Sequence, residues 1–238
     1  MSQFIFNQIG VIRSPYKEKF AIPRQPGLVE DGGGALQLLP PYTQAECVRG
    51  LENFSHIWIL FIFHQTMENR WHPTVRPPRL GGNARTGVFA TRSPFRPNPI
   101  GMSLVELKGI HTIGDTITLE LGSLDLVDGT PVVDIKPYLP FAESYPQARA
   151  GFAQMAPDAA MPVFFSSFAE KQIAEHQKKY PHLKRFISQV LAQDPRPAYR
   201  KGENILREYA VSLLEFNVRW RVCDEKTEVL SLDHTHNP

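Results

Sequence analysis

The N-terminal part of the chain shows the hydrophobic pattern of short β-strands. Residues 3–13 are rich in β-branched and aromatic side chains, and residues 55–67 form a nearly continuous apolar run that predicts a strand buried on both faces or lining a barrel. Three further short β-type runs cover residues 105–110, 116–121 and 132–135. Many short strands with tight turns predict a barrel or a sandwich.

Glycine and aspartate mark the expected connections between these strands. Asp31–Gly34 predicts a hairpin turn, because glycine tolerates a positive φ. Gly114-Asp115 and Asp128-Gly129 are further hairpin signals. A short helix is expected over residues 42–53, closed at Gly50.

The C-terminal part mixes helical and strand patterns. A strand over residues 162–168 precedes a helix over 168–180, where Ser167 and Glu170 form a capping box, and a second helix over 182–192 stops at Asp194-Pro195. Three strands follow, over residues 208–214, 216–224 and 228–232, and we expect them to be antiparallel.

These patterns predict an α+β chain of two domains. The sequence has 238 residues, enough for two modest hydrophobic cores. We expect a strand-rich N-terminal domain over residues 1–141 and a smaller α+β domain over 163–238. Residues 142–162 between them are rich in alanine and proline, which is typical of a linker.

A dense group of arginines separates two of the expected strands. Residues 69–105 contain no acidic side chain, carry six prolines that exclude long helices and central strands, and contain arginines at 70, 76, 79, 85, 92 and 96. Arginine grips phosphate or carboxylate with a planar fork and stacks on bases. An anionic or nucleotide-like ligand is the first interpretation, and a solvated basic surface is the alternative.

A second basic loop lies in the C-terminal part. It contains Arg196, Tyr199 and Arg200, and in the expected strand over 216–224 Arg219 and Arg221 point away from the apolar face. Arginines beside a tyrosine suit a splayed-out RNA loop, and they suit plain solvent exposure equally well.

Charge and cysteine content narrow the class of protein. The net charge of +2 is too small to indicate a nucleic-acid binder by itself, so the clustering of arginine carries that argument. Two unpaired-looking cysteines and the lack of a signal-peptide pattern predict a soluble protein of the reducing cytoplasm, with no membrane span. His56, His64 and His72 lack the spacing of a metal site, so we expect no metal. Phosphate-loop and dinucleotide fingerprints are also missing.

Three motifs resemble a known family. The segments ATRSPFRPNPIG (90–101), LDLVDGTPVVDIKPYLPF (124–141) and QDPRPAYRKG (193–202) are similar to the TsaA-like family of tRNA methyltransferases. The resemblance implies an S-adenosylmethionine-dependent enzyme that methylates N6 of N6-threonylcarbamoyladenosine at position 37 of threonine tRNA. It also implies that the N-terminal domain is a single-sheet β-barrel that dimerises and binds the cofactor.

The resemblance places two segments at the cofactor, Pro23, Arg24 and Gln25 in one and His64 and Gln65 in the other. We add Arg92 as a cation for the cofactor, and Met102 and the corner formed by Asp128, Gly129, Thr130 and Pro131 as its packing surface. From the residues alone, without the resemblance, an ordinary type I′ turn is the favoured interpretation of that corner.

Arg85, Arg96 and Arg196 are the candidates for tRNA phosphate or for the threonyl carboxylate, and no general base is identifiable. Two other function classes stay open. They are a non-catalytic RNA-binding module without a cofactor pocket and a small-molecule enzyme acting on anionic substrates.

Overall fold

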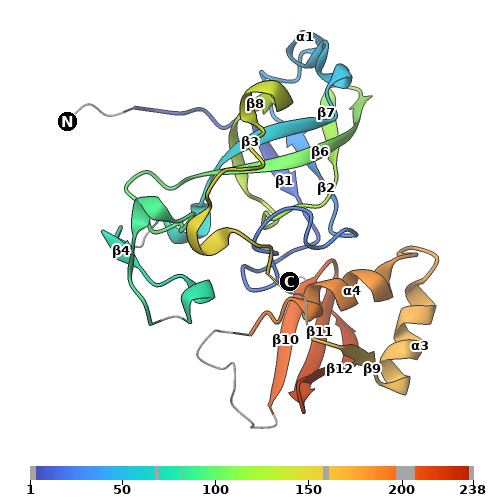
Figure 1. The fold of residues 1–238 in the computed structure, drawn as a ribbon. Coiled ribbons are helices and arrows are strands. Elements are labelled where there is room, and N and C mark those ends of the chain that lie inside the picture. The colour runs from blue at the N-terminus through green and yellow to red at the C-terminus, as the bar shows by residue number, and fades with distance from the viewer. Residues whose placement is uncertain (1–3, 68–69, 82, 158–160, 197–206, 236–238) are drawn as a thin grey trace. The chain divides into compact units, whose positions relative to one another are not determined.

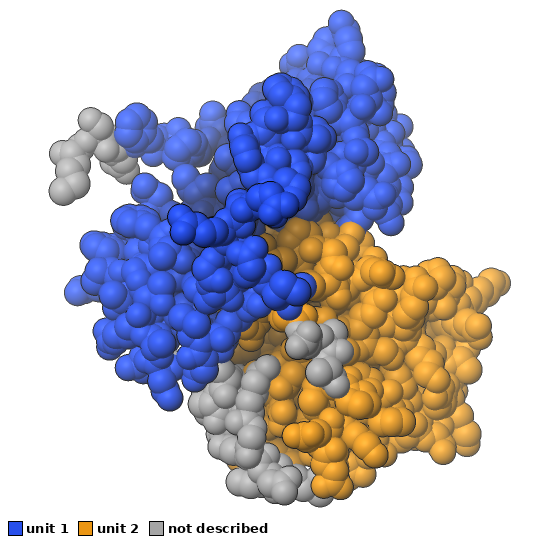
Figure 2. Space-filling view, viewed as in Figure 1, with its two compact units in different colours: residues 1–13, 34–122, 129–156 blue, residues 14–33, 123–128, 157–238 orange. Residues whose placement is uncertain are grey.

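The computed structural model describes residues 4–67, 70–81, 83–157, 161–196 and 207–235. The chain forms two compact units, coloured separately in Figure 2. The first unit comprises Met1–Arg13, Gly34–Gly122 and Gly129–Ala156, and the second comprises Ser14–Gly33, Ser123–Asp128 and Pro157–Pro238. The structure is mostly strand with a few helices, as an α+β chain requires.

Six strands of the first unit form one closed, ring-like sheet (Figure 1). Their order around the ring is β1-β2-β7-β6-β3-β8, and β8 pairs back with β1. All of these pairings are antiparallel. The strands are β1 Gly10–Arg13, β2 Gly34–Leu38, β3 His56–Ile62, β6 Ile100–Ile113, β7 Thr116–Leu121 and β8 Pro131–Pro137.

Along the strands of the ring, buried side chains that face the interior alternate with more exposed ones. In β7 Ile117, Leu119 and Leu121 are at most 1% exposed, while the residues between them face outward. The other strands supply the remaining core: Ile12, Leu36, Leu38, Ile57, Ile59, Phe61, Val105, Leu107 and Val132. Burial of these side chains inside the ring is the main force that holds it together.

Phe61 enters this core next to a glycine. Gly101 of β6 pairs with Phe61 of β3, and a Cβ atom on Gly101 would lie 2.2 Å from the ring atom Cζ of Phe61. The aromatic ring of Phe61 therefore occupies the space that a side chain at position 101 would need.

Short elements surround the ring in the first unit. The hairpin β4–β5 belongs to the arginine-rich stretch, and α1 buries none of its residues. The bounds are α1 Ala45–Val48, η1 Leu51–Asn53, η2 His64–Thr66, β4 Thr74–Val75, η3 Pro78–Leu80, β5 Thr86–Gly87, η4 Val88–Ala90, α2 Pro140–Glu143 and η5 Gly151–Ala153.

The second unit is a four-stranded sheet with two helices. Its strand order is β10-β11-β12-β9, in which β9 is parallel to β12 and the other pairs are antiparallel. Helix α3 packs on β12 and α4 contacts β9, so their apolar faces complete the core (Figure 1). The bounds are β9 Val163–Phe165, α3 Ser167–His176, α4 Leu183–Ala192, β10 Glu208–Leu213, β11 Phe216–Cys223 and β12 Lys226–His234.

The N-terminal segment Ser14–Gly33 belongs to the second unit and is anchored by Tyr16. This side chain is fully buried, its backbone bridges Leu213, and its ring centroid lies 5.8 Å from that of Phe186. Gly32 gives it room, because a Cβ there would lie 1.9 Å from the Tyr16 hydroxyl. The bridge to Leu213 links the segment to β10, and the contact with Phe186 links it to α4.

Two of the three expected hairpins are wrong. The Gly114-Asp115 turn does join the paired strands β6 and β7. Asp128-Gly129 joins β7 to β8, which are not neighbours in the ring, and residues 27–30, directly before the turn at Asp31–Gly34, form no strand. Gly129 alone has a positive φ of 78° in its corner, so the corner is not the type I′ turn, which requires two. Turn residues give the bend but do not specify which strands pair.

Several expected elements are shorter or shifted. Residues 4–9 of the first expected strand are irregular, and the helix over 42–53 is two short turns, α1 and η1, separated by Gly50 at a φ of 85°. The cap of α3 is Ser166 rather than Ser167, because the Ser166 hydroxyl accepts a hydrogen bond from the Ala169 amide at 3.1 Å. Helix α3 ends at His176, four residues before the expected end at residue 180.

A bilayer-spanning helix needs about 20 mostly apolar residues. No helix among the described residues reaches that combination of length and apolarity.

Candidate functional site

One end of the ring gathers three motifs that are far apart in the sequence. Because β3 is antiparallel to both neighbours, its C-terminal end lies beside the N-terminal ends of β6 and β8. Ile62 pairs with Ile100, Phe61 pairs with Val132, and the Phe63 amide donates to the Pro99 carbonyl at 2.8 Å. We call residues 61–65, 99–102 and 129–132 the rim.

Strand β1 fixes the third part of the rim. The Ile12 amide donates to the Thr130 carbonyl at 3.0 Å, and the Gly129 amide donates to the Ile12 carbonyl at 2.9 Å. Thr130 is 2% exposed, whereas Gly129 is exposed. The corner is therefore held rigidly by the backbone, as a preformed binding surface requires.

Three predicted cofactor residues present side chains at the rim. His64 and Gln65 form the start of η2 directly after β3, with His64 half-buried and Gln65 exposed. Met102 is 49% exposed, because it lies on the outer face of β6 between the buried Gly101 and Ser103. An exposed methionine beside polar groups marks a surface that suits an apolar ligand part.

Arg96 braces the loop that leads into the rim. Its Nη2 donates to the carbonyls of Thr91 at 2.8 Å and Val88 at 3.2 Å, and its Nε is buried without a partner among the described residues. The Thr91 hydroxyl adds a hydrogen bond to the Val88 carbonyl at 2.8 Å. This internal bracing leaves the neighbouring Arg92 exposed on a fixed loop.

Four predicted cofactor residues belong to the second unit. Pro23 is buried and Arg24 is exposed, with Gln25 half-buried after it. The Asp128 carboxylate accepts from the Ser14 amide and from the Lys17 ammonium, both at 2.8 Å. Asp128 thus anchors the start of the segment Ser14–Gly33.

The predicted RNA-binding arginines differ in how much of each guanidinium faces solvent. Arg85 is exposed and makes a long hydrogen bond of 3.4 Å to Thr74. Arg196 forms a bidentate pair with Asp194 in which the side chains are only 10% and 13% exposed, and the hydrogen bonds to Asp194 raise the pKa of Arg196. The roles of Arg96 and Arg196 in binding RNA stay predictions.

The two arginines of β11 lie on the polar face of the strand, as expected. Arg219 pairs with Glu208, and Arg221 pairs with Glu228 at 2.7 Å. Both pairs lie near the surface, where an ion pair contributes at most about 1 kcal/mol, so a phosphate can displace the carboxylate. Tyr199 and Arg200 lie outside the described residues.

Sequence reasoning missed a set of exposed aromatic side chains among the arginines. Trp71, Phe89 and Phe95 are 52%, 82% and 36% exposed. Backbone hydrogen bonds from Val88 to Pro73 at 3.0 Å and from His72 to Phe95 at 3.3 Å hold their segments together. The sequence signal for them is that each stands near an arginine, in a stretch whose apolar residues follow neither the two-residue repeat of a strand nor the 3.6-residue repeat of a helix.

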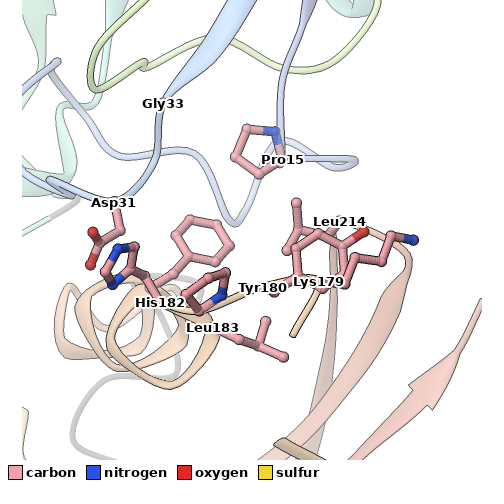
Figure 3. A pocket seen from close by; sticks show the side chains of 10 residues that line it. Pro15, Asp31, Gly33, Lys179, Tyr180, His182, Leu183 and Leu214 are labelled. Carbon is pink, nitrogen blue, oxygen red and sulfur yellow. The ribbon is translucent and has the colours of Figure 1, made fainter. Parts of the chain in front are cut away.

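A small pocket lies within the second unit, and none of the predicted cofactor residues lines it (Figure 3). It has a volume of about 200 Å³ and is lined by Pro15, Asp31, Lys179, Tyr180 and Phe186 among others. Pockets for ligands of nucleoside size have volumes of about 300–1,000 Å³. This pocket therefore does not provide the cofactor site.

Two family models together match nearly the whole chain. The tRNA-methyltransferase O N-terminal domain matches residues 11–144, and the TrmO C-terminal domain matches residues 158–235. The tRNA (adenine(37)-N6)-methyltransferase of Escherichia coli is 69% identical over 233 residues, which cover 98% of this chain and 99% of that protein.

Other relatives agree with these matches. A putative S-adenosylmethionine-dependent methyltransferase of Pseudomonas aeruginosa is 50% identical over 89% of this chain and 90% of its own length. The crystal structure of TrmO from that bacterium has a TM-score of 0.79 at 41% identity and covers 99% of both chains.

Proposed function

We propose a function for this chain on the basis of its family: it belongs to the tRNA-methyltransferase O family. The chain is a tRNA (adenine-N6)-methyltransferase that uses S-adenosylmethionine. The observation that carries the proposal is the near full-length identity of 69% with a tRNA (adenine(37)-N6)-methyltransferase. We propose further that the modified base is N6-threonylcarbamoyladenosine at position 37 of threonine tRNA. The resemblance of the motifs at 90–101 and 124–141 supports this narrower substrate.

The chemistry of the rim, together with Arg92 in the loop that leads into it, fits S-adenosylmethionine. The methionine part of that cofactor carries a carboxylate, which suits the exposed Arg92, and its adenine needs an apolar surface and backbone polar groups. Met102 offers the surface, and the exposed backbone at Gly129 offers a polar edge. His64 and Gln65 would complete the site. We leave Pro23, Arg24, Gln25 and Asp128 as predictions.

When bound, the cofactor supplies an electrophilic methyl group on a sulfonium. The chain must hold the adenine N6 in line with it, since near-attack positioning is the main contribution of a protein to such a displacement. Methylation replaces the N6 proton, which leaves to solvent or to a base. An attached carbamoyl group makes that proton more acidic, and a nearby guanidinium would stabilise the resulting anion.

The surface of the first unit suits an anticodon loop. Its exposed arginines, with Arg85 among them, offer phosphate contacts. Phe89 and Trp71 present the aromatic faces on which unstacked bases bind in single-stranded RNA recognition. Because basic and aromatic groups lie together on loops held by internal hydrogen bonds, we favour RNA over a small anionic molecule as the substrate.

Four further features are part of the proposal. The closed sheet would be a β-barrel, two copies of which would form a homodimer in the cytoplasm. The domain limits would be residues 1–141 and 163–238, joined by a linker at 142–162. Sedimentation of the purified chain tests the dimer, and a monomer at working concentration would contradict it.

Calorimetry with S-adenosylmethionine tests the cofactor site. We expect the affinity of the Arg92→Ala variant to fall about 10-fold or more, since a charge-assisted contact contributes roughly 1.5–3 kcal/mol. Arg49→Ala is the matched control, because Arg49 is exposed and pairs with Glu46 of α1 at 3.2 Å. Equal affinity of all three proteins would refute the role of Arg92.

Calorimetry with the cofactor and tRNA-binding measurements at several salt concentrations separate the competing classes. A non-catalytic RNA-binding module would not bind the cofactor at all. A small-molecule enzyme would lack tRNA binding that weakens steeply with salt, which follows from counterion release.

A further inference from the structure

Two histidines and a glutamate meet at one corner of the second unit. His176 ends α3, Glu215 lies in the turn between β10 and β11, and His234 ends β12. One nitrogen or carboxylate oxygen from each lies within 4.8 Å of the others. Neither the family match nor the methyl transfer chemistry uses this cluster.

The sheet fixes the backbone of all three residues. Phe216, next to Glu215, pairs with His234, and the Thr235 amide donates to the Glu215 carbonyl at 2.9 Å. Leu214 turns the chain with a φ of 55°. Glu215 and His234 are therefore held side by side by strand pairing, while the last turn of α3 brings His176.

A buried aromatic ring orients the two imidazoles. Phe216 is fully buried, and its centroid lies 4.7 Å from that of His176 and 5.1 Å from that of His234. The two imidazole centroids are 5.0 Å apart at an interplanar angle of 79°. Packing on a common ring limits the rotation of both imidazoles, so their nitrogens stay close to the glutamate.

The distance between the groups suits an ion better than a hydrogen bond. The Nδ1 of His234 lies 4.0 Å from the Oε1 of Glu215. Two ligands that each lie about 2.0–2.2 Å from a zinc ion are roughly 3.3–3.6 Å apart in a tetrahedral site. Side-chain movements of about 1 Å would bring the three atoms to such a site.

The second carboxylate oxygen is already held. The Lys179 ammonium donates to Oε2 of Glu215 at 2.6 Å, which leaves Oε1 facing His234. Ligating carboxylates commonly have such an outer hydrogen bond, which fixes their direction. The ammonium charge also repels a cation, so we expect weaker affinity than in a site of three uncompensated ligands.

We propose that His176, Glu215 and His234 bind a zinc ion, with water as the fourth ligand. Imidazole and carboxylate ligands suit zinc among the divalent metals available to proteins. The ion would tie together α3, the β10–β11 turn and β12. Because it binds only the folded unit, it stabilises the native state in proportion to its affinity and concentration.

Zinc titration of the tag-free full chain tests the site. Competition with a chromophoric zinc indicator is expected to show one zinc per chain, with affinity at least 10-fold lower in His176→Ala and in Glu215→Gln. His111→Ala is the matched control, because His111 forms a comparable exposed pair with Glu120 at 2.9 Å. Equal zinc affinity in the wild type and the cluster variants would overturn the proposal.

Cobalt gives a second readout that does not depend on stability. The wild type with one equivalent of Co²⁺ is expected to show visible absorption bands of tetrahedral intensity, and His234→Asn is expected to lose them while keeping its circular dichroism spectrum. Bands that persist in His234→Asn would place the ion elsewhere. Loss of the bands in His236→Ala alone would assign the metal to the chain end and would likewise refute the cluster.

Discussion

The contact between Gly101 and Phe61 gives the sharpest test of how the rim is built. In a Gly101→Ala variant the new Cβ would lie 2.2, 2.4 and 2.8 Å from three atoms of the Phe61 ring. Real side-chain contacts do not reach such distances, so the ring or β6 must move. Phe61 is 6% exposed inside a closed sheet, so it has little space to move into.

The size of the effect follows from two opposing contributions. Overpacking a core by one methyl group typically costs about 1–3 kcal/mol. Replacing glycine with alanine also reduces the entropy of the unfolded chain, which stabilises by about 0.4–1 kcal/mol where φ is compatible. Gly87→Ala isolates this second contribution, because nothing lies within 4 Å of a Cβ there and its φ of −55° suits alanine.

Urea unfolding of the two variants measures the difference. We expect the free energy of unfolding of Gly101→Ala to be about 1–3 kcal/mol below that of Gly87→Ala. Adding Phe61→Leu to Gly101→Ala should recover part of the loss, because the smaller side chain vacates the contact. Because Phe61 lies at the rim, cofactor affinity should fall in Gly101→Ala but not in Gly87→Ala. Equal stability of the two alanine variants would refute the account of the close approach.

Three further predictions concern a helix cap, a buried tyrosine and an exposed aromatic residue. Ser166→Ala should lower the free energy of unfolding by about 1 kcal/mol through loss of the α3 cap, whereas Ser167→Ala should change it by less than about 0.5 kcal/mol, as urea unfolding would show. Burial, with a smaller contribution from Asp125, raises the pKa of Tyr16 above its ordinary value, so only the unfolded chain ionises this phenol near pH 10. Stability should therefore fall as the pH rises above about 10, and Tyr16→Phe should reduce that slope in unfolding experiments at pH 8 and pH 10.5. Phe89→Ala should weaken tRNA binding about 5- to 100-fold by loss of base stacking in filter-binding assays, while Phe168→Ala, which is 58% exposed on α3, should not, and equal effects would refute a specific role.

The alternation of apolar and polar residues along the sequence predicted those strands in which buried and exposed side chains alternate regularly. The strand over residues 116–121 was predicted with the bounds that β7 has, and the three C-terminal strands were predicted as an antiparallel set. Residues 4–9 resemble a strand in composition, yet they are irregular and leave Phe4 and Ile5 79% and 88% exposed. Composition alone does not supply the neighbouring strand that a sheet requires.

The cap of α3 shows a finer limit of sequence reasoning. Ser166 and Ser167 are both good capping residues, and the choice depends on which one has an extended backbone. Ser166 does, with a ψ of 157°, and its hydroxyl also donates to the Leu230 carbonyl of β12. A tertiary contact therefore selects the helix start.

The sequence identified the segments of the rim but not their arrangement. The motifs at 90–101 and 124–141 are recognisable from the sequence, whereas their meeting at one end of the ring follows from the antiparallel pairing of β3 with β6 and β8. Strand pairing between distant segments is not encoded in any local pattern. The histidine–glutamate cluster was missed for the same reason, because α3, the β10–β11 turn and β12 meet only in the folded sheet.

Analysis of tRNA nucleosides by mass spectrometry tests the central claim most directly. Threonine tRNA carrying N6-threonylcarbamoyladenosine would be incubated with the purified chain and isotope-labelled S-adenosylmethionine, then digested. We predict one labelled methyl group on N6 of that nucleoside, and a strongly reduced yield with Arg92→Ala. An unlabelled nucleoside after incubation with folded, cofactor-binding protein would contradict the proposed reaction, and label on another nucleoside would contradict the proposed substrate.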